Sequence, residues 1–83
     1  MIVEYVQAAL ENAHYEIIDD DEPFYGEVPQ LEGVWASGKT LEDCRHNLAE
    51  VVEGWILVRS SQGLDVPSIG GFSVTPVKEL MVA

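Results

Sequence analysis

Positive charge is the property that this chain has least of. Its 83 residues include 4 lysines and arginines against 15 aspartates and glutamates, which gives a formal net charge of −11 at pH 7. Such a surface repels the phosphate backbone of DNA and RNA, so direct binding of nucleic acid is not expected. A basic protein is the macromolecular partner that fits this charge, although an acidic surface can also serve solubility alone.

Cysteine and long apolar runs are also scarce. A single cysteine, Cys44, excludes an internal disulfide bond. The first residues lack the positively charged segment and following apolar run of a signal peptide. No apolar stretch approaches the roughly 18–20 residues that cross a bilayer. The sequence therefore predicts a cytoplasmic protein that is not inserted in a membrane.

The length of the chain predicts one domain, residues 1–83, with limited burial. A domain of this size buries only about 60–65% of the surface that its unfolded chain exposes. Hydrophobic residues nevertheless make up 47% of the sequence. That excess of apolar side chains favours association between copies, and a homo-oligomer, most simply a dimer, is expected.

The N-terminal part begins with a helical pattern and continues with three strand patterns. Residues 2–12 place apolar side chains at Val3, Val6 and Leu10, a spacing that predicts a short amphipathic helix, with a strand as the competing interpretation. Three strands follow, at residues 14–18, 24–28 and 33–37, each ended by acidic, proline or glycine residues. Their short connections predict antiparallel neighbours.

The long segment at residues 40–62 has the strongest pattern of the chain. Thr40 can accept a hydrogen bond from the amide of Asp43, and Gly63 can end the helix. An apolar stripe at helical spacing is expected to face the sheet; it consists of Leu41, Cys44, Leu48, Val51, Val52, Trp55 and Val58.

These elements predict an α+β fold. A three- to four-stranded, mainly antiparallel sheet is expected to be covered on one face by the helix at residues 40–62, with the short helix at the N-terminus. Residues 72–77 supply the possible fourth strand, and Pro76 would place it at an edge.

The acid run, Asp19–Glu22, is the densest group of candidate metal ligands. It lacks the spacing and the central glycine of a calcium loop, so metal binding is not expected there. A solvated turn and a docking surface for a basic protein remain as alternatives.

Cys44 and His46 do not face each other on a helix, and Cys44 is interpreted as a core residue. No catalytic triad, phosphate loop or zinc spacing is found, so neither an enzyme nor a cofactor is expected.

The aromatic residues divide between core and surface. Trp55 continues the helical stripe and is assigned to the core, whereas Trp35 lies in a short strand and is expected to be exposed. Phe24 and Tyr25 fit either place. An exposed aromatic side chain in a small acidic protein is more typical of a protein interface than of a cofactor site.

Several short motifs follow one another between Phe24 and Pro67. They are Tyr25-Gly26, Val28-Pro29, Leu31, Gly33, Gly38, Thr40-Leu41-Glu42, Asn47-Leu48, Glu50, Trp55, Gly63 and Pro67. Their order and spacing resemble those of the HicB-like family, the antitoxins of bacterial toxin–antitoxin pairs. The resemblance covers about half to two-thirds of the chain. It implies a partial ribonuclease-H-like fold and, as partner, a small basic HicA-type toxin that cleaves RNA.

The resemblance implies that the chain binds such a toxin and keeps its RNA-contacting surface away from RNA. The residues expected at the contact are Asp19, Asp20, Asp21, Glu22, Phe24, Tyr25 and Trp35. Many HicB-like proteins also carry a C-terminal DNA-binding segment, which is not expected here after Pro67. Two alternatives stay open. One is an oligomeric scaffold or binding module without a toxin, and the other is a metal-dependent nucleic-acid enzyme, which would need carboxylates from separate elements to converge.

Overall fold

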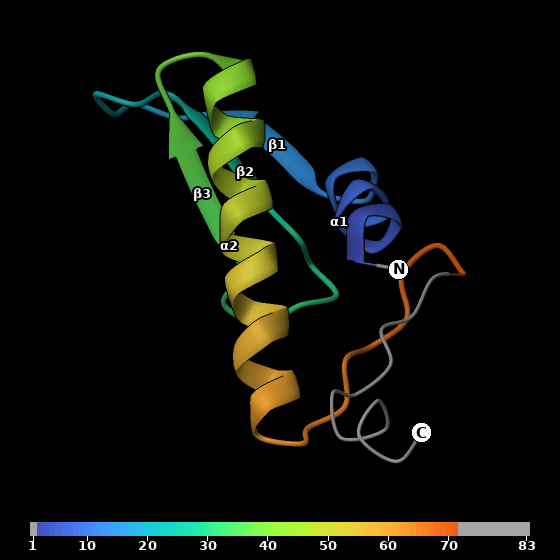
Figure 1. Cartoon of the computed structure of the whole chain (residues 1–83). Coiled ribbons are helices and arrows are strands. Elements are labelled where there is room, and N and C mark those ends of the chain that lie inside the picture. The colour runs from blue at the N-terminus through green and yellow to red at the C-terminus, as the bar shows by residue number, and fades with distance from the viewer. Residues whose placement is uncertain (1, 72–83) are drawn as a thin grey trace.

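The α+β fold predicted from the sequence is confirmed by a computed structural model, which describes residues 2–71 (Figure 1). The elements are α1 (Ile2–Glu11), β1 (His14–Ile17), β2 (Phe24–Glu27), β3 (Trp35–Gly38) and α2 (Leu41–Ser61). The predicted strand at residues 72–77 lies outside the described residues.

The three strands form one antiparallel sheet in the order β1-β2-β3, as predicted. The third strand begins at Trp35 and not at Gly33. Its expected first residues belong to a tight loop, in which the amide of Leu31 donates to the carbonyl of Val28 and the amide of Val34 to that of Leu31. Gly33 adopts a φ of 80° inside this loop, a conformation that no regular strand contains.

Both ends of α2 are capped as the sequence predicts. The side chain of Thr40 accepts a hydrogen bond of 3.0 Å from the amide of Asp43. At the other end, the amide of Leu64 donates to the carbonyl of Arg59 and Gly63 has a φ of 71°. This pair of features is a Schellman ending, in which glycine supplies the left-handed residue.

The buried face of α2 is narrower than the predicted stripe. It consists of Cys44, Leu48, Val52, Ile56 and Ser60, a single row at four-residue intervals. The expectation was wrong for Leu41, Val51 and Val58, which are 45%, 37% and 56% exposed, and it missed Ile56. Trp55 is half-buried. The row is single because α2 meets a narrow sheet along one line and extends beyond its end (Figure 1).

The helix α1 packs beside α2 through a face that the sequence only partly predicts (Figure 1). Val6 is buried as expected, but Val3 is 67% exposed, while Tyr5 and Ala9 are fully buried. Tyr5 is fixed by a hydrogen bond of 2.5 Å from its hydroxyl to the carbonyl of Pro67. The buried side of α1 is therefore the side that contains Tyr5, because the segment after α2 returns to cover this residue.

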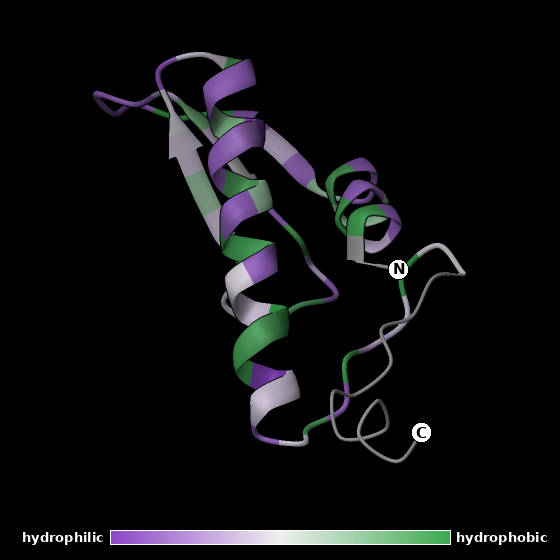
Figure 2. Cartoon of the chain, viewed as in Figure 1, coloured by the Kyte–Doolittle hydropathy of each residue, from purple (hydrophilic) through white to green (hydrophobic). Residues whose placement is uncertain are grey.

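The core lies between the sheet, α2, α1 and the returning segment. Figure 2 shows the contrast between this interior and the β1–β2 loop, which projects from the sheet as a hydrophilic segment. The fully or almost fully buried apolar side chains are Tyr5, Ala9, Val28, Leu31, Val34, Cys44, Leu48, Val52, Ile56 and Ile69.

Candidate protein-binding face

Within residues 2–71, one face of the sheet is not covered by a helix. Successive side chains of a strand point to opposite faces, so the residues that flank the helix-facing Gly26 and Ala36 point away from α2. We call this surface the outer face. In the register of the three strands it consists of two rows, His14, Glu27 and Trp35 in one and Glu16, Tyr25 and Ser37 in the other.

Two aromatic rings form the centre of the outer face. Tyr25 and Trp35 are diagonal neighbours on β2 and β3, and their rings stack with centroids 5.9 Å apart and an angle of 27° between planes. Trp35 is 54% exposed, so the prediction that this tryptophan lies on the surface is confirmed. The pair forms a preformed apolar platform that is open to solvent.

Carboxylates surround the aromatic pair. The pKa of the Tyr25 phenol is raised above its ordinary value of 10.0, first by partial burial of the ring and then by the negative charges of Glu27 and Glu16. The imidazole of His14 lies 3.8 Å from the carboxylate of Glu16 and adds positive charge only when it is protonated. The outer face is therefore both aromatic and acidic.

The described lysines and arginines lie elsewhere. The guanidinium of Arg45 lies 5.7 Å from the centre of the Tyr15 ring, on the helix side of the sheet. That of Arg59 lies 4.8 Å from the Trp55 ring, near the end of α2. Lys39 is in the turn between β3 and α2. Within residues 2–71, no lysine or arginine belongs to the outer face, so its carboxylates are not neutralised by these side chains.

The acid run is linked to the outer face by its last residue. Asp19, Asp20 and Asp21 are exposed in the loop between β1 and β2. Glu22 is half-buried, and its Oε1 accepts a hydrogen bond of 2.8 Å from the Oγ of Ser37. The run thus continues the acidic outer face beyond the end of the sheet (Figures 1 and 2).

The residues predicted at the contact are only partly brought together. Phe24 is in the strand position next to Tyr25, so its side chain points to the helix side of the sheet. The outer face also contains Glu16 and Glu27, which the sequence prediction omitted. The signal that could have found them is the strand alternation itself, which places polar residues next to Tyr15 and next to Gly26.

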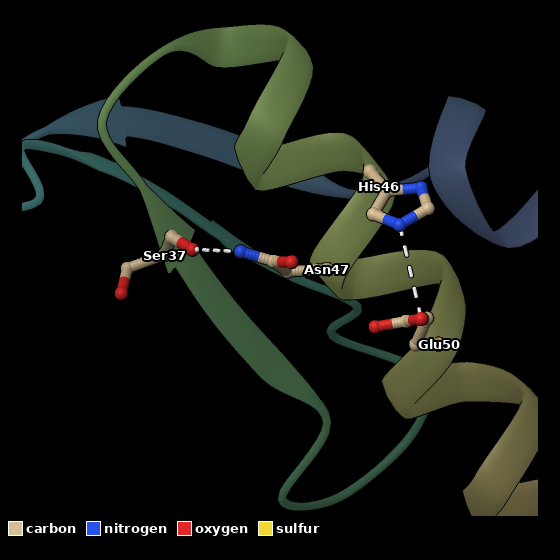
Figure 3. Close-up of polar contacts among 4 residues, drawn as sticks. All are labelled: Ser37, His46, Asn47 and Glu50. Atoms are coloured by element: carbon tan, nitrogen blue, oxygen red, sulfur yellow. Dashed lines mark hydrogen bonds and ion pairs between the residues drawn. The ribbon is translucent and has the colours of Figure 1, made fainter.

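Close packing between the sheet and α2 holds the outer face in place. A Cβ added to Gly38 would lie 2.5 Å from the backbone nitrogen of Cys44, so only glycine fits there. Asn47 of α2 donates a hydrogen bond of 2.9 Å from its Nδ2 to the carbonyl of Ser37, whose side chain points away from the helix (Figure 3). The helix therefore supports the strand that carries Trp35.

The side chains of Cys44 and His46 lie on different sides of α2, as the sequence predicts. Cys44 is fully buried, and burial raises the pKa of its thiol. His46 lies on the side of α2 that is turned away from β3, with its Nε2 3.7 Å from the carboxylate of Glu50 (Figure 3). The two side chains do not form a nucleophile and base.

Neither a metal centre nor a membrane span is found within the described part of the chain. No group of three or more histidine, cysteine, aspartate or glutamate side chains is arranged to hold a metal ion among residues 2–71. None of the helices in that range is long and apolar enough to cross a bilayer.

Comparison with known proteins shows the family of the chain. Residues 4–67 match the family described as UPF0150-like. The chain belongs to this family. The UPF0150-like region includes all three strands and the whole of α2, and so the complete outer face.

A solved structure supports the fold of this UPF0150-like chain. The chain is similar to TTHA0281 from Thermus thermophilus, whose crystal structure aligns with a TM-score of 0.83 and 42% sequence identity. The alignment covers 89% of this chain and 91% of that one. No curated protein is similar enough to add a further comparison. These similarities show family and fold, and the activity has to be inferred from the outer face.

Proposed function

We propose that this UPF0150-like protein is a HicB-like antitoxin, which binds a small basic HicA-type toxin and covers its RNA-binding surface. The observation that carries the proposal is the outer face, where the stacked Tyr25 and Trp35 lie among Glu16, Glu27 and the acid run. A surface that binds RNA is positively charged, and this face offers it the opposite charge together with an apolar centre.

The proposed mechanism is occlusion. The carboxylates of the acid run and of the outer face attract the basic toxin over a distance of about a Debye length and accelerate encounter. Tyr25 and Trp35 then become buried in the contact, where aromatic side chains contribute most of the binding energy of many interfaces. The chain performs no chemical step in this proposal, and it acts in the cytoplasm, where the RNA substrate of the toxin is present.

The resemblance to HicB-like antitoxins is consistent with this geometry because several of its residues build the support of the outer face. Gly38 allows the sheet and α2 to approach closely, and Gly26 leaves room for the ring of Tyr15 on β1. Leu48 packs in the core between the sheet and α2. Asn47 holds the carbonyl of Ser37. The resemblance thus concerns the residues that position the face, and the charge of the face supports a basic partner.

The proposal is tested by removing the charge of the acid run. A variant with Asp19→Asn, Asp20→Asn and Asp21→Asn should associate more slowly with the HicA-like protein encoded by a neighbouring gene, by roughly tenfold at low salt. The salt dependence of its association rate should also be weaker, because these exposed charges act at long range. The measurement is stopped-flow binding at two ionic strengths.

The matched control carries the same change in net charge at another place. Glu11→Gln, Glu50→Gln and Glu53→Gln remove three exposed carboxylates from the two helices, away from the outer face. This control should associate at close to the rate of the unaltered protein. Equal effects of the two variants would mean that net charge alone guides binding. Absence of any binding to the toxin would refute the antitoxin proposal and leave the scaffold alternative.

A further inference from the structure

Both arginines of the chain lie over aromatic rings. The sequence contains only Arg45 and Arg59, whose guanidinium groups are 5.7 Å from the centre of the Tyr15 ring and 4.8 Å from that of Trp55. Arg59 also donates a hydrogen bond of 2.8 Å from its Nε to the carbonyl oxygen of Asp65. A guanidinium is planar, so its face can stack on a ring while its N–H groups bond at the edge to an oxygen acceptor. Arg59 makes both kinds of contact at once.

The outer face offers another ring and acceptor of this kind, at Trp35 and Glu27. The two residues are directly opposite each other on β3 and β2, and their side chains point to the same side of the sheet. The Cβ atoms of such a pair are about 4.5–5.5 Å apart. Stacking on Tyr25 covers only part of the Trp35 side chain, which remains 54% exposed. An open aromatic surface therefore lies next to a carboxylate.

No arginine of this chain is available for that place. Arg45 lies on the helix side of the sheet and Arg59 near the end of α2. The two remaining cations of the sequence are lysines, Lys39 in the turn between β3 and α2 and Lys78 outside the described residues. The fourth strand expected at residues 72–77 would extend an edge of the sheet and would not cover a face. A guanidinium on Trp35 therefore has to come from another molecule.

We propose that an arginine side chain of the basic partner stacks on Trp35 and donates hydrogen bonds to the carboxylate of Glu27. The inference rests on the proposed function, because it names the group by which the outer face holds the toxin. Arginine fits this pair better than lysine, since an ammonium has no flat face, is more strongly hydrated and cannot donate two parallel hydrogen bonds to one carboxylate. Trp35 and Glu27 thereby select among basic proteins, whereas the acid run attracts all of them.

The neighbouring side chains prepare this place for a cation. The ring of Tyr25 stacks on that of Trp35 and restricts the indole before the partner arrives. Glu16 lies directly opposite Tyr25 on β1 and adds a second carboxylate to the same face. Ser37, on the other side of Tyr25, already donates to Glu22. Little reordering is needed when an arginine binds, so little of the binding energy is lost to it.

The first test compares two capped peptides of equal charge on the full-length protein. The peptides are five residues long and differ only in carrying two arginines or two lysines between glycines. NMR titration at pH 8, where histidine side chains carry little charge, should show about five- to tenfold tighter binding of the arginine peptide. The indole N–H signal of Trp35 should shift, whereas that of Trp55, which Arg59 already covers, should stay in place.

Substitutions test whether Glu27 and Trp35 cause the preference. Glu27→Gln removes the charge at nearly constant size, and Trp35→Leu removes the ring; each should reduce the preference for arginine to less than about twofold. Trp35→Phe should keep part of it. The control Glu53→Gln removes an exposed carboxylate of α2 and should keep all of it. Affinities are taken from the backbone amide signals of β2 and β3, whose dispersion also reports that each variant is folded.

The inference is overturned if the two peptides bind equally well, if the preference survives in Glu27→Gln or Trp35→Leu, or if the peptide shifts the Trp55 signal instead. It is also overturned if the Trp35 signal moves with protein concentration alone or in Lys78→Gln without peptide, because a second copy or the chain's own lysine would then occupy the place. A toxin that binds the outer face despite equal peptide affinities would refute only the selection of arginine. An arginine preference without toxin binding would refute only the identity of the partner.

Discussion

The two faces of the three-stranded sheet differ most at the positions where α2 approaches. The covered face contains Gly26, Ala36 and Gly38 where α2 approaches, and the outer face contains the large side chains of Tyr25 and Trp35. The backbone of α2 lies against Gly38, where only a small residue fits, although the covered face also contains the larger side chains of Tyr15 and Phe24. On the outer face the two rings have space, because none of the helices and strands described in residues 2–71 packs over them. Residues that serve the fold and residues available for binding therefore alternate along the same strands.

The largest effect on the fold is expected from the core beneath the covered face. Leu48→Ala removes a fully buried side chain of α2 and should lower the free energy of unfolding by about 2–5 kcal/mol. In a domain of this size that loss corresponds to a decrease in Tm of the order of 10 °C or more. Thermal melting followed by circular dichroism measures it.

The matched control for Leu48 is on the same helix. Leu57→Ala makes the same chemical change at a side chain that is 58% exposed, and its Tm should change by only a few degrees. If the two variants melted within one degree of each other, the assignment of the buried face of α2 would be wrong.

An intermediate effect is expected where the backbone of α2 contacts the sheet. Gly38→Ala adds a Cβ that would lie 2.5 Å from the nitrogen of Cys44, and because backbone atoms cannot rotate away the helix must shift. Overpacking of this kind costs about 1–3 kcal/mol of stability. Chemical denaturation measures the change.

Gly54 provides the comparison for Gly38. A Cβ added to this glycine of α2 has no neighbour within 4 Å, so Gly54→Ala should stabilise the protein by up to about 1 kcal/mol through helix propensity. Equal destabilisation by both substitutions would show that close packing at Gly38 is not the cause.

The smallest effect on stability is expected from the outer face. Trp35→Ala removes a half-exposed ring and its stacking with Tyr25, which should cost only about 0.5–1.5 kcal/mol of folding stability. If the outer face binds the toxin as proposed, the same change should accelerate dissociation by about 30-fold, the effect of losing a 2 kcal/mol anchor residue. Surface plasmon resonance measures the dissociation rate.

The conservative variant Trp35→Phe separates the two roles of this residue. It keeps an aromatic ring next to Tyr25 and should restore much of the slow dissociation. A Trp35→Ala variant that unfolds, or one that dissociates from the toxin at the original rate, would remove the distinction between the two faces.

Local signals explain what the sequence predicts well. The ends of α2 follow from Thr40 and Gly63, because capping depends on residues within one turn of the helix. The three antiparallel strands follow in the same way from their alternation and short loops. The buried state of Cys44 and the exposure of Trp35 were also predicted correctly, since each depends on the position within its own element.

Tertiary contacts explain what the sequence does not predict. Val51 and Val58 have the right period for a core stripe, but only one line of α2 meets the sheet, and Ile56 lies on that line. Val3 is exposed because Tyr5 takes its place against the segment that contains Pro67. The outer face could not be assembled from the acid run and the aromatic residues alone, because strand register decides which side chains share a surface.

The hydrogen bond between Tyr5 and Pro67 joins residues 62 positions apart in the sequence. During synthesis on the ribosome, α1 emerges early, but the carbonyl that holds Tyr5 and the buried side chain of Ile69 are added only after α2 is complete. The packing of α1 against α2 is therefore completed only when almost all of the described chain has been translated. For residues 2–71, co-translational folding would end with the docking of the first helix.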